Sequence, residues 1–209
     1  MIRVDPVDHR QGEGQGWEPV TRWVQNKANQ AAPVQVFLHG PAVTPGAMAP
    51  LNTLQALDQM PSVTVTVCQA AWQRLGLNRE PPLAVASLVE LWANLSRAQH
   101  IGMWGRGEWP ASSADWPRVA EPALTEGGAW GLMVAHAPDQ ADRQSLLELA
   151  LAAAVLELDV VVGFGPAATE ELSGETGQRW AQLTDHRLAG IITQASEDDR
   201  YHERRWLVV

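Results

Sequence analysis

The chain alternates short apolar runs with longer segments whose apolar residues recur at helical spacing. The runs at 34–38 ("VQVFL") and 63–67 ("VTVTV") are rich in β-branched residues, which favours extended strands. Strands that alternate with helices predict parallel sheets covered on both faces and joined by right-handed crossovers. Further strands are expected at 100–104, 129–137, 159–164 and 188–192, and helices at 49–60, 69–75, 83–98, 146–158 and 176–184.

One local motif predicts where a helix begins. Ser145 and Glu148 stand three positions apart at the start of "LLELALAAAVLEL". A serine and a glutamate at this spacing form a capping box, in which each side chain bonds a backbone N–H of the first turn. We therefore expect the helix over 146–158 to open at Ser145.

The sequence contains an internal repeat. Residues 34–70 align without gaps on residues 159–195 at a constant offset of 125, with eight identities. The identities cluster at strand ends, where "GPA" at 40–42 matches "GPA" at 165–167 and "QA" at 69–70 matches "QA" at 194–195. The repeat predicts two related three-layer α/β/α units with mainly parallel sheets, of the flavodoxin-like kind, packed as a fused pseudo-dimer.

The two units are expected at residues 1–104 and 129–209. Residues 105–128 between them are rich in Pro, Gly and Ser and show no clear period, which is typical of a linker. The first unit lacks an obvious opening strand, because the offset places that strand at residues 4–11, which are polar and contain Pro6. Each copy lacks a structural element that the other has, so packing of the two copies on one another would complete both units.

Composition and charge exclude several functional classes. The hydrophobic fraction of 45% and charged fraction of 19% indicate a folded globular protein. The formal net charge is -9 and Lys27 is the only lysine, so no basic stripe is present to neutralise a phosphate backbone. Direct nucleic-acid binding is disfavoured, and an acidic surface suits basic partners.

Nothing along the chain predicts a targeting or membrane segment. Residues 1–16 contain no apolar core of the kind that a signal peptide has. The longest apolar stretch, residues 146–164, is interrupted by Glu148, Glu157 and Asp159, which a membrane span rarely tolerates. We expect a soluble cytoplasmic protein.

The only cysteine, Cys68, follows the strand at 63–67 and precedes the helix at 69–75. A single cysteine excludes an internal disulfide and a thiolate-rich metal cluster, and no metal site is expected. Catalytic groups in parallel sheets gather beyond the carboxyl ends of the strands. The N–H groups of a following helix stabilise a thiolate over a thiol, so the position favours a nucleophilic Cys68.

Four neighbours are candidates for lining a site around Cys68. His39 stands at the tip of the strand at 34–38, Gly40 and Pro41 form the loop after it, and Gln69 follows Cys68. Glycine permits close backbone approach and proline rigidifies the loop. Structural roles stay open: His39 as a core histidine, Gln69 as a helix-face residue, and Cys68 as a buried, inert space-filling residue.

Other chemistries find little support. No recognisable hydrolase motif accompanies Cys68, which disfavours a Cys-His-Asn/Asp hydrolase. The segment "GFGPAATEE" lacks the spacing of a P-loop or of G-x-G-x-x-G, so nucleotide binding is also disfavoured.

These residues resemble a known family. The pattern "VQVFLHGPAVTPG", a helix, "VTVTVCQAAWQRLGL" and then "LAVASLVELWANLSRAQHIGMW" resembles the DsrE/TusD family of sulfur-relay proteins. The second copy, from "GLMVAHAPDQADRQSLLELALAAAVLELDVVVGFGP" to "LAGIITQAS", is similar to the TusC/DsrF type of subunit. The resemblance covers residues 34–104 and 129–195.

The resemblance implies a function for one residue. Members of this family carry sulfane sulfur as a persulfide on a cysteine, which Cys68 matches, and the second copy has Thr193 there. The family implies no metal or organic cofactor, donor and acceptor proteins with reactive thiols as partners, and a homo- or hetero-oligomer. The ten tryptophans of the chain agree with an assembled protein, because tryptophan is enriched in cores and interfaces.

Three functional hypotheses follow. The first is a cytoplasmic sulfur-relay protein that carries sulfur on Cys68 and passes it to a partner thiol; if enzymatic, it is a sulfurtransferase. The alternative is a non-catalytic assembly subunit of a DsrE-type complex in which Cys68 is buried and inert. A third is a small-molecule-binding α/β protein that uses its Gly-Pro loops. Solvent access to Cys68 discriminates the first two.

Overall fold

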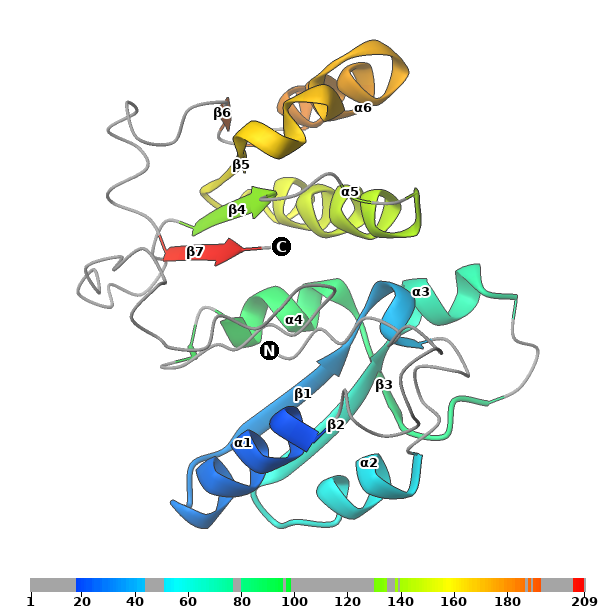
Figure 1. Cartoon of the computed structure of the whole chain (residues 1–209), viewed down its shortest axis with the longest axis vertical. Coiled ribbons are helices and arrows are strands. Elements are labelled where there is room, and N and C mark those ends of the chain that lie inside the picture. Colours follow the sequence, from blue (N-terminus) through cyan, green and yellow to red (C-terminus); the bar gives the residue numbers. More distant parts are fainter. Residues whose placement is uncertain are drawn as a thin grey trace. The chain divides into compact units, whose positions relative to one another are not determined.

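The structure is a computed structural model of the chain, which divides into two compact units (Figure 1). The first unit comprises Met1–Leu91 and Ala98–Gly107, and the second comprises Trp92–Arg97 and Glu108–Val209. The residues that the structure describes are 18–43, 51–76, 80–95, 97–98, 130–134, 138, 140–186, 188, 190–192 and 205–208.

The first unit is built on a three-stranded sheet in the order β1-β2-β3, in which both strand pairs are parallel. Valine, threonine and phenylalanine dominate β1 and β2, and these residues fit a pleated, buried surface. The elements in chain order are α1 (Glu18–Asn29), β1 (Val34–Leu38), the 3-10 helix η1 (Gly40–Val43), α2 (Leu51–Asp58), β2 (Val63–Cys68), α3 (Gln69–Arg74), β3 (Ala84–Ala86) and α4 (Leu88–Leu95), whose second half belongs to the second unit.

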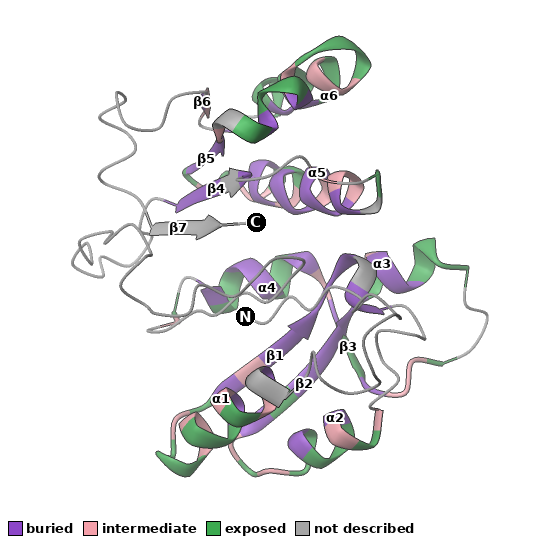
Figure 2. Cartoon of the chain, viewed as in Figure 1, coloured by how far each residue is buried: buried purple, intermediate pink, exposed green. Residues whose placement is uncertain are grey.

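Helices cover the strands of the first unit. α1 packs on β1 and on α2, and α2 packs on β2. Val20 and Val24, one turn apart on α1, are both fully buried, which gives this otherwise polar helix its core-facing stripe. β1 and β2 are buried along most of their length, and both appear largely purple in Figure 2.

The second unit holds a four-stranded, all-parallel sheet in the order β6-β5-β4-β7. The chain moves outward from β4 to β5 and β6 and then returns to place β7 on the other side of β4. The fully buried Trp180 packs edge-on against Phe164, with ring centroids 5.1 Å apart. Its elements are β4 (Trp130–Val134), α5 (Gln140–Val155), β5 (Val160–Phe164), the 3-10 helix η2 (Pro166–Leu172), α6 (Gly174–Asp185), β6 (Gly190–Ile192) and β7 (Arg205–Val208).

The internal repeat is present in the strand register. In the first unit Val36, Phe37 and Leu38 pair with Val65, Thr66 and Val67. In the second unit the pairs are Val161 with Gly190, Val162 with Ile191 and Gly163 with Ile192, so every partner is related to its counterpart by the offset of 125. Each unit also continues from its first repeat strand into a 3-10 helix, a helix and a second strand.

The structure extends the repeat toward the N-terminus. The offset places α1 inside the span of α5, and α1 packs on β1 and α2 as α5 packs on β5 and α6. Both sheets are parallel with helices on both sides of the strands, which confirms the expected fold class of two related α/β units. The sequence did not predict α1, nor the strand β7.

The expected helix over 83–98 is wrong at its start. Ala84–Ala86 form strand β3, paired with Thr66–Cys68, and α4 begins only at Leu88. Ser87 ends the extended segment because its hydroxyl oxygen accepts the N–H of Glu90 at 3.1 Å. The Glu90 carboxylate in turn accepts the N–H and the hydroxyl of Ser87 at 2.6 and 2.9 Å, which completes a capping box.

The capping box expected at Ser145 is also wrong. α5 begins five residues earlier, at Gln140, and Ser145 is fully buried within the helix. The buried positions Asp142, Leu146 and Leu149 continue the helical period back beyond Ser145, so packing extends the helix past the local motif. The strand expected at 100–104, the linker expected at 105–128 and residues 4–11, where no obvious opening strand was expected, lie outside the described residues.

Among the described helices, none is long and apolar enough to cross a bilayer.

Candidate functional site

Cys68 is the last residue of β2 and the N-cap of α3. Its backbone is extended, with φ -62° and ψ 119°, and it pairs with Ala86 of β3. The side chain is fully buried, with 0% of its surface exposed. The sequence thus predicted the strand end and the helix start at Cys68, while burial became visible only in the structure.

The strand register brings His39 to the level of Cys68. Leu38 and Val67 are the last register partners of β1 and β2, and His39 and Cys68 are the residues that follow them. Neighbouring strands in a sheet lie about 4.8 Å apart. His39 is itself 95% buried, and its ring stacks on that of Phe37 with centroids 6.4 Å apart.

The Gly-Pro turn borders the same end of the sheet. Gly40 has φ +59°, a left-handed conformation that favours glycine, and it lets the chain leave β1 directly into η1. η1 packs against both α3 and β2, so the turn that contains Gly40 and Pro41 lies beside the helix that Cys68 caps. Gln69, the first residue of α3, is exposed, whereas Cys68 before it is buried.

The site combines two opposing electrostatic effects. An N-cap position places Cys68 next to the N–H groups of the first turn of α3, which stabilise negative charge on the sulfur. Complete burial disfavours the charged form, because a thiolate in apolar surroundings loses its hydration. A reactive thiolate at this place therefore needs a counter-charge or a proton acceptor nearby.

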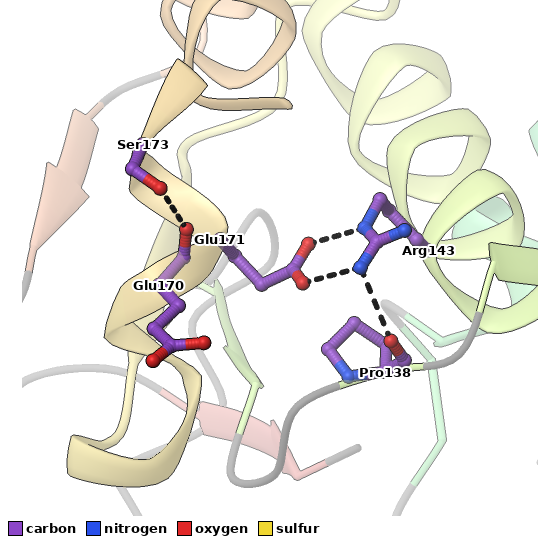
Figure 3. Close-up of polar contacts among 5 residues, drawn as sticks. All are labelled: Pro138, Arg143, Glu170, Glu171 and Ser173. Carbon is purple, nitrogen blue, oxygen red and sulfur yellow. Dashed lines mark hydrogen bonds and ion pairs between the residues drawn. The ribbon is translucent and has the colours of Figure 1, made fainter. Parts of the chain in front are cut away.

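A second polar cluster lies in the second unit, and the sequence did not point to it (Figure 3). Arg143 on α5 donates from Nε and Nη2 to the two carboxylate oxygens of Glu171 on η2, at 2.5 and 2.6 Å. Nη2 also donates to the Pro138 carbonyl at 3.3 Å. The side chain of Glu171 is only 6% exposed and that of Arg143 is 29% exposed.

This ion pair joins two elements that follow neighbouring strands. α5 follows β4 and η2 follows β5, so the pair lies at the carboxyl end of the second sheet. The bidentate geometry is the strong form of an arginine–carboxylate contact. Glu171 already occupies the guanidinium fork of Arg143, so we assign the pair a structural role in tying η2 to α5.

No family model, no curated protein and no solved structure matches this chain. The resemblance to the sulfur-relay family therefore stays a prediction from the residues quoted above.

Proposed function

We propose that this protein is a sulfur carrier of the cytoplasm that holds sulfane sulfur as a persulfide on Cys68 and passes it to a partner thiol. The observation that carries the proposal is the place of Cys68: it ends a parallel strand, caps a helix and stands beside the Gly40 turn. Ligands and reactive groups of parallel sheets gather at such strand ends. Its partners are donor and acceptor proteins with reactive thiols, and it works as part of an oligomer.

The transfer is a thiol exchange at sulfur. The Cys68 thiolate attacks the outer sulfur of a donor persulfide, a bond forms between Sγ and that sulfur, and the donor S–S bond breaks. The donor leaves as a thiolate and takes up the proton that Cys68 gave up. The net reaction converts one thiol and one persulfide into one persulfide and one thiol, so no oxidant or reductant is consumed.

The complete burial of Cys68 favours a second candidate function, a non-catalytic assembly subunit with an inert cysteine. A carrier has to expose its sulfur to a donor, and a thiol with 0% exposure reacts only when the surrounding structure opens. A scaffold has no such requirement.

Intact mass spectrometry discriminates the two functions. The purified protein and a Cys68→Ser variant are incubated with a low-molecular-weight persulfide and their masses are compared. A carrier gains the mass of one sulfur atom and the variant gains none, and a thiol-containing acceptor then removes the added sulfur. If folded wild-type protein gains no sulfur over hours of incubation, the carrier proposal is overturned and the scaffold is retained.

A further inference from the structure

We propose that His39 is the proton acceptor for the Cys68 thiol, so that the two residues form a coupled thiol–imidazole pair at the carboxyl end of the first sheet. The inference rests on the proposed function for its chemical role, although the pairing itself can be measured without any sulfur transfer.

The register places both side chains on one face of the sheet. Phe37 and Thr66 are register partners, and His39 and Cys68 each follow them by two residues. Side chains two residues apart in a strand point to the same face. The ring stacking of His39 on Phe37, at 6.4 Å and 30°, agrees with this orientation for the histidine. At a strand spacing of about 5 Å, the register places His39 and Cys68 at adjacent positions on this face.

The second unit serves as an internal comparison. At the offset of 125, His39 corresponds to Phe164 and Cys68 corresponds to Thr193. The unit that lacks the thiol thus also lacks the imidazole. Phe164 packs on Trp180 as an ordinary core residue, while the corresponding position in the first unit holds a titratable ring that is 95% buried. Burying a polar ring costs free energy unless the ring forms hydrogen bonds.

Among the described residues, few charged side chains lie on the elements around Cys68. Glu90, on the helix that follows β3, accepts two hydrogen bonds from Ser87. β1, β3 and η1, which pack on β2 or border this end of it, carry no charged side chain. α3 carries Arg74 in its last turn, away from the helix start. α2 carries Asp58, whose carboxylate accepts the N–H of Val65 further back on β2. The charged side chains described on α1, which packs on β1, are Arg22 and Lys27.

His39 offers the buried thiol a proton acceptor and, once protonated, a positive charge. When Cys68 attacks a donor persulfide, the thiol proton moves to a nitrogen of His39 and an imidazolium forms next to the sulfur. After the donor S–S bond breaks, the imidazolium returns this proton to the departing thiolate. The proton is conserved, and the imidazolium offsets the cost of a buried negative charge during the exchange.

The test measures the coupling of the two titrations. Because Cys68 is the only cysteine, the ultraviolet absorbance of the thiolate, taken as the difference from Cys68→Ser, reports this residue alone. The thiolate is titrated in wild type, in His39→Phe and in His39→Gln. His39→Phe keeps a ring that can stack on Phe37 and copies the residue that the second unit uses. His186→Gln, which removes an exposed histidine of the second unit, is the matched control.

We expect thiolate formation to move upward by about one pH unit or more in both His39 variants and to stay unchanged in His186→Gln. In Cys68→Ser, the imidazole titration of His39 followed by NMR should move downward, because coupling between two sites is reciprocal. Unchanged titrations of both groups in folded proteins would overturn the inference.

Persulfide loading of the same proteins separates this inference from the proposed function. Both the thiol–imidazole pair and the carrier function are supported if the titrations are coupled, wild type loads rapidly, and His39→Phe loads about tenfold more slowly or slower still. Coupled titrations without loading support the pair and overturn the carrier. Loading at equal rates in wild type and His39→Phe, with no coupling, supports the carrier and overturns the role of His39.

Discussion

At the residue scale, Gly177 shows how local packing reverses a general preference. A glycine within a helix usually costs about 0.5–1 kcal/mol relative to alanine. In α6, however, a Cβ on Gly177 would overlap the backbone carbonyl of Leu172 in η2. Backbone atoms cannot move aside as a flexible side chain does, so the close approach requires glycine.

We therefore expect Gly177→Ala to lower the free energy of unfolding by about 1–3 kcal/mol, as overpacking does. Chemical denaturation of both proteins measures the difference. Gln178→Ala is the control, since Gln178 is exposed on the same helix and alanine favours helices. An alanine at 177 that leaves stability unchanged or raises it would show that η2 and α6 do not approach this closely.

The ion pair of Figure 3 gives a second prediction at this scale. Glu171→Gln removes the charge that the partly buried Arg143 faces, and we expect a loss of about 2 kcal/mol in the free energy of unfolding. Glu170→Gln, a change at the exposed neighbouring carboxylate, should cost far less. Equal effects of the two substitutions in denaturant titrations would contradict the structural role assigned to the pair.

At the element scale, the capping box of α4 links helix stability to pH. Two hydrogen bonds from Ser87 lower the pKa of Glu90 from its ordinary 4.5. The bond from the backbone N–H has the larger effect and the bond from the hydroxyl the smaller one. The folded-state pKa is thus below the unfolded-state value. The stabilisation is fully present above the unfolded-state pKa and is lost as the pH falls through the folded-state pKa.

A Glu90→Gln variant checks this sign, because glutamine keeps the capping geometry without the charge. We expect wild type to be the more stable protein near neutral pH and the difference to vanish in acid. The measurement is the free energy of unfolding across this pH range. Glu80→Gln, which removes the same charge from another exposed position in the first unit, is the control; identical pH profiles for the two variants would refute the prediction.

Sequence patterns predicted the elements that local signals determine. β1 matches its expected span of 34–38 because a five-residue, mainly apolar run follows Pro33 and ends just before the Gly-Pro turn. β3 was missed because "AVA" has no strand signal of its own and becomes extended only by pairing with β2. The capping boxes show the same limit: S-x-x-E occurs at Ser87 and at Ser145, and tertiary packing decides which one starts a helix.

The candidate site was predictable only in part. The end of a β-branched strand located Cys68, and the Gly-Pro turn located His39 and Gly40 near the neighbouring strand end. The shared level of His39 and Cys68 depends on register, which the hydrophobic pattern alone does not determine to a single residue. The Arg143–Glu171 pair joins residues 28 positions apart and left no local signal in the sequence.

At the scale of the whole molecule, the two units differ in how their sheets are completed. β5 has a neighbour on both sides, β4 and β6, whereas the corresponding β1 pairs only with β2 among the described strands. β7 adds a parallel partner to β4 along Trp130–Met133. The second sheet therefore depends on a strand that comes from far along the chain.

Ending the chain before Arg205 should lower hydrogen-exchange protection in the second unit only. We expect backbone amides of β4 to lose protection in hydrogen exchange, because half of an interior strand's hydrogen bonds go to each neighbour. Amides of β1 and β2 should exchange as in wild type. A chain that ends after Val208 is the control, and unchanged protection of β4 in the shorter chain would contradict the pairing with β7.

The burial of Cys68 also makes this thiol a natural probe of local opening in the first unit. A thiol with no exposed surface can be labelled only in the brief intervals when the strand end opens, so the labelling rate at low denaturant reports the free energy of that opening. No probe has to be engineered, because no second cysteine competes for the reagent. The same opening sets an upper limit on how often any sulfur donor can meet the thiol.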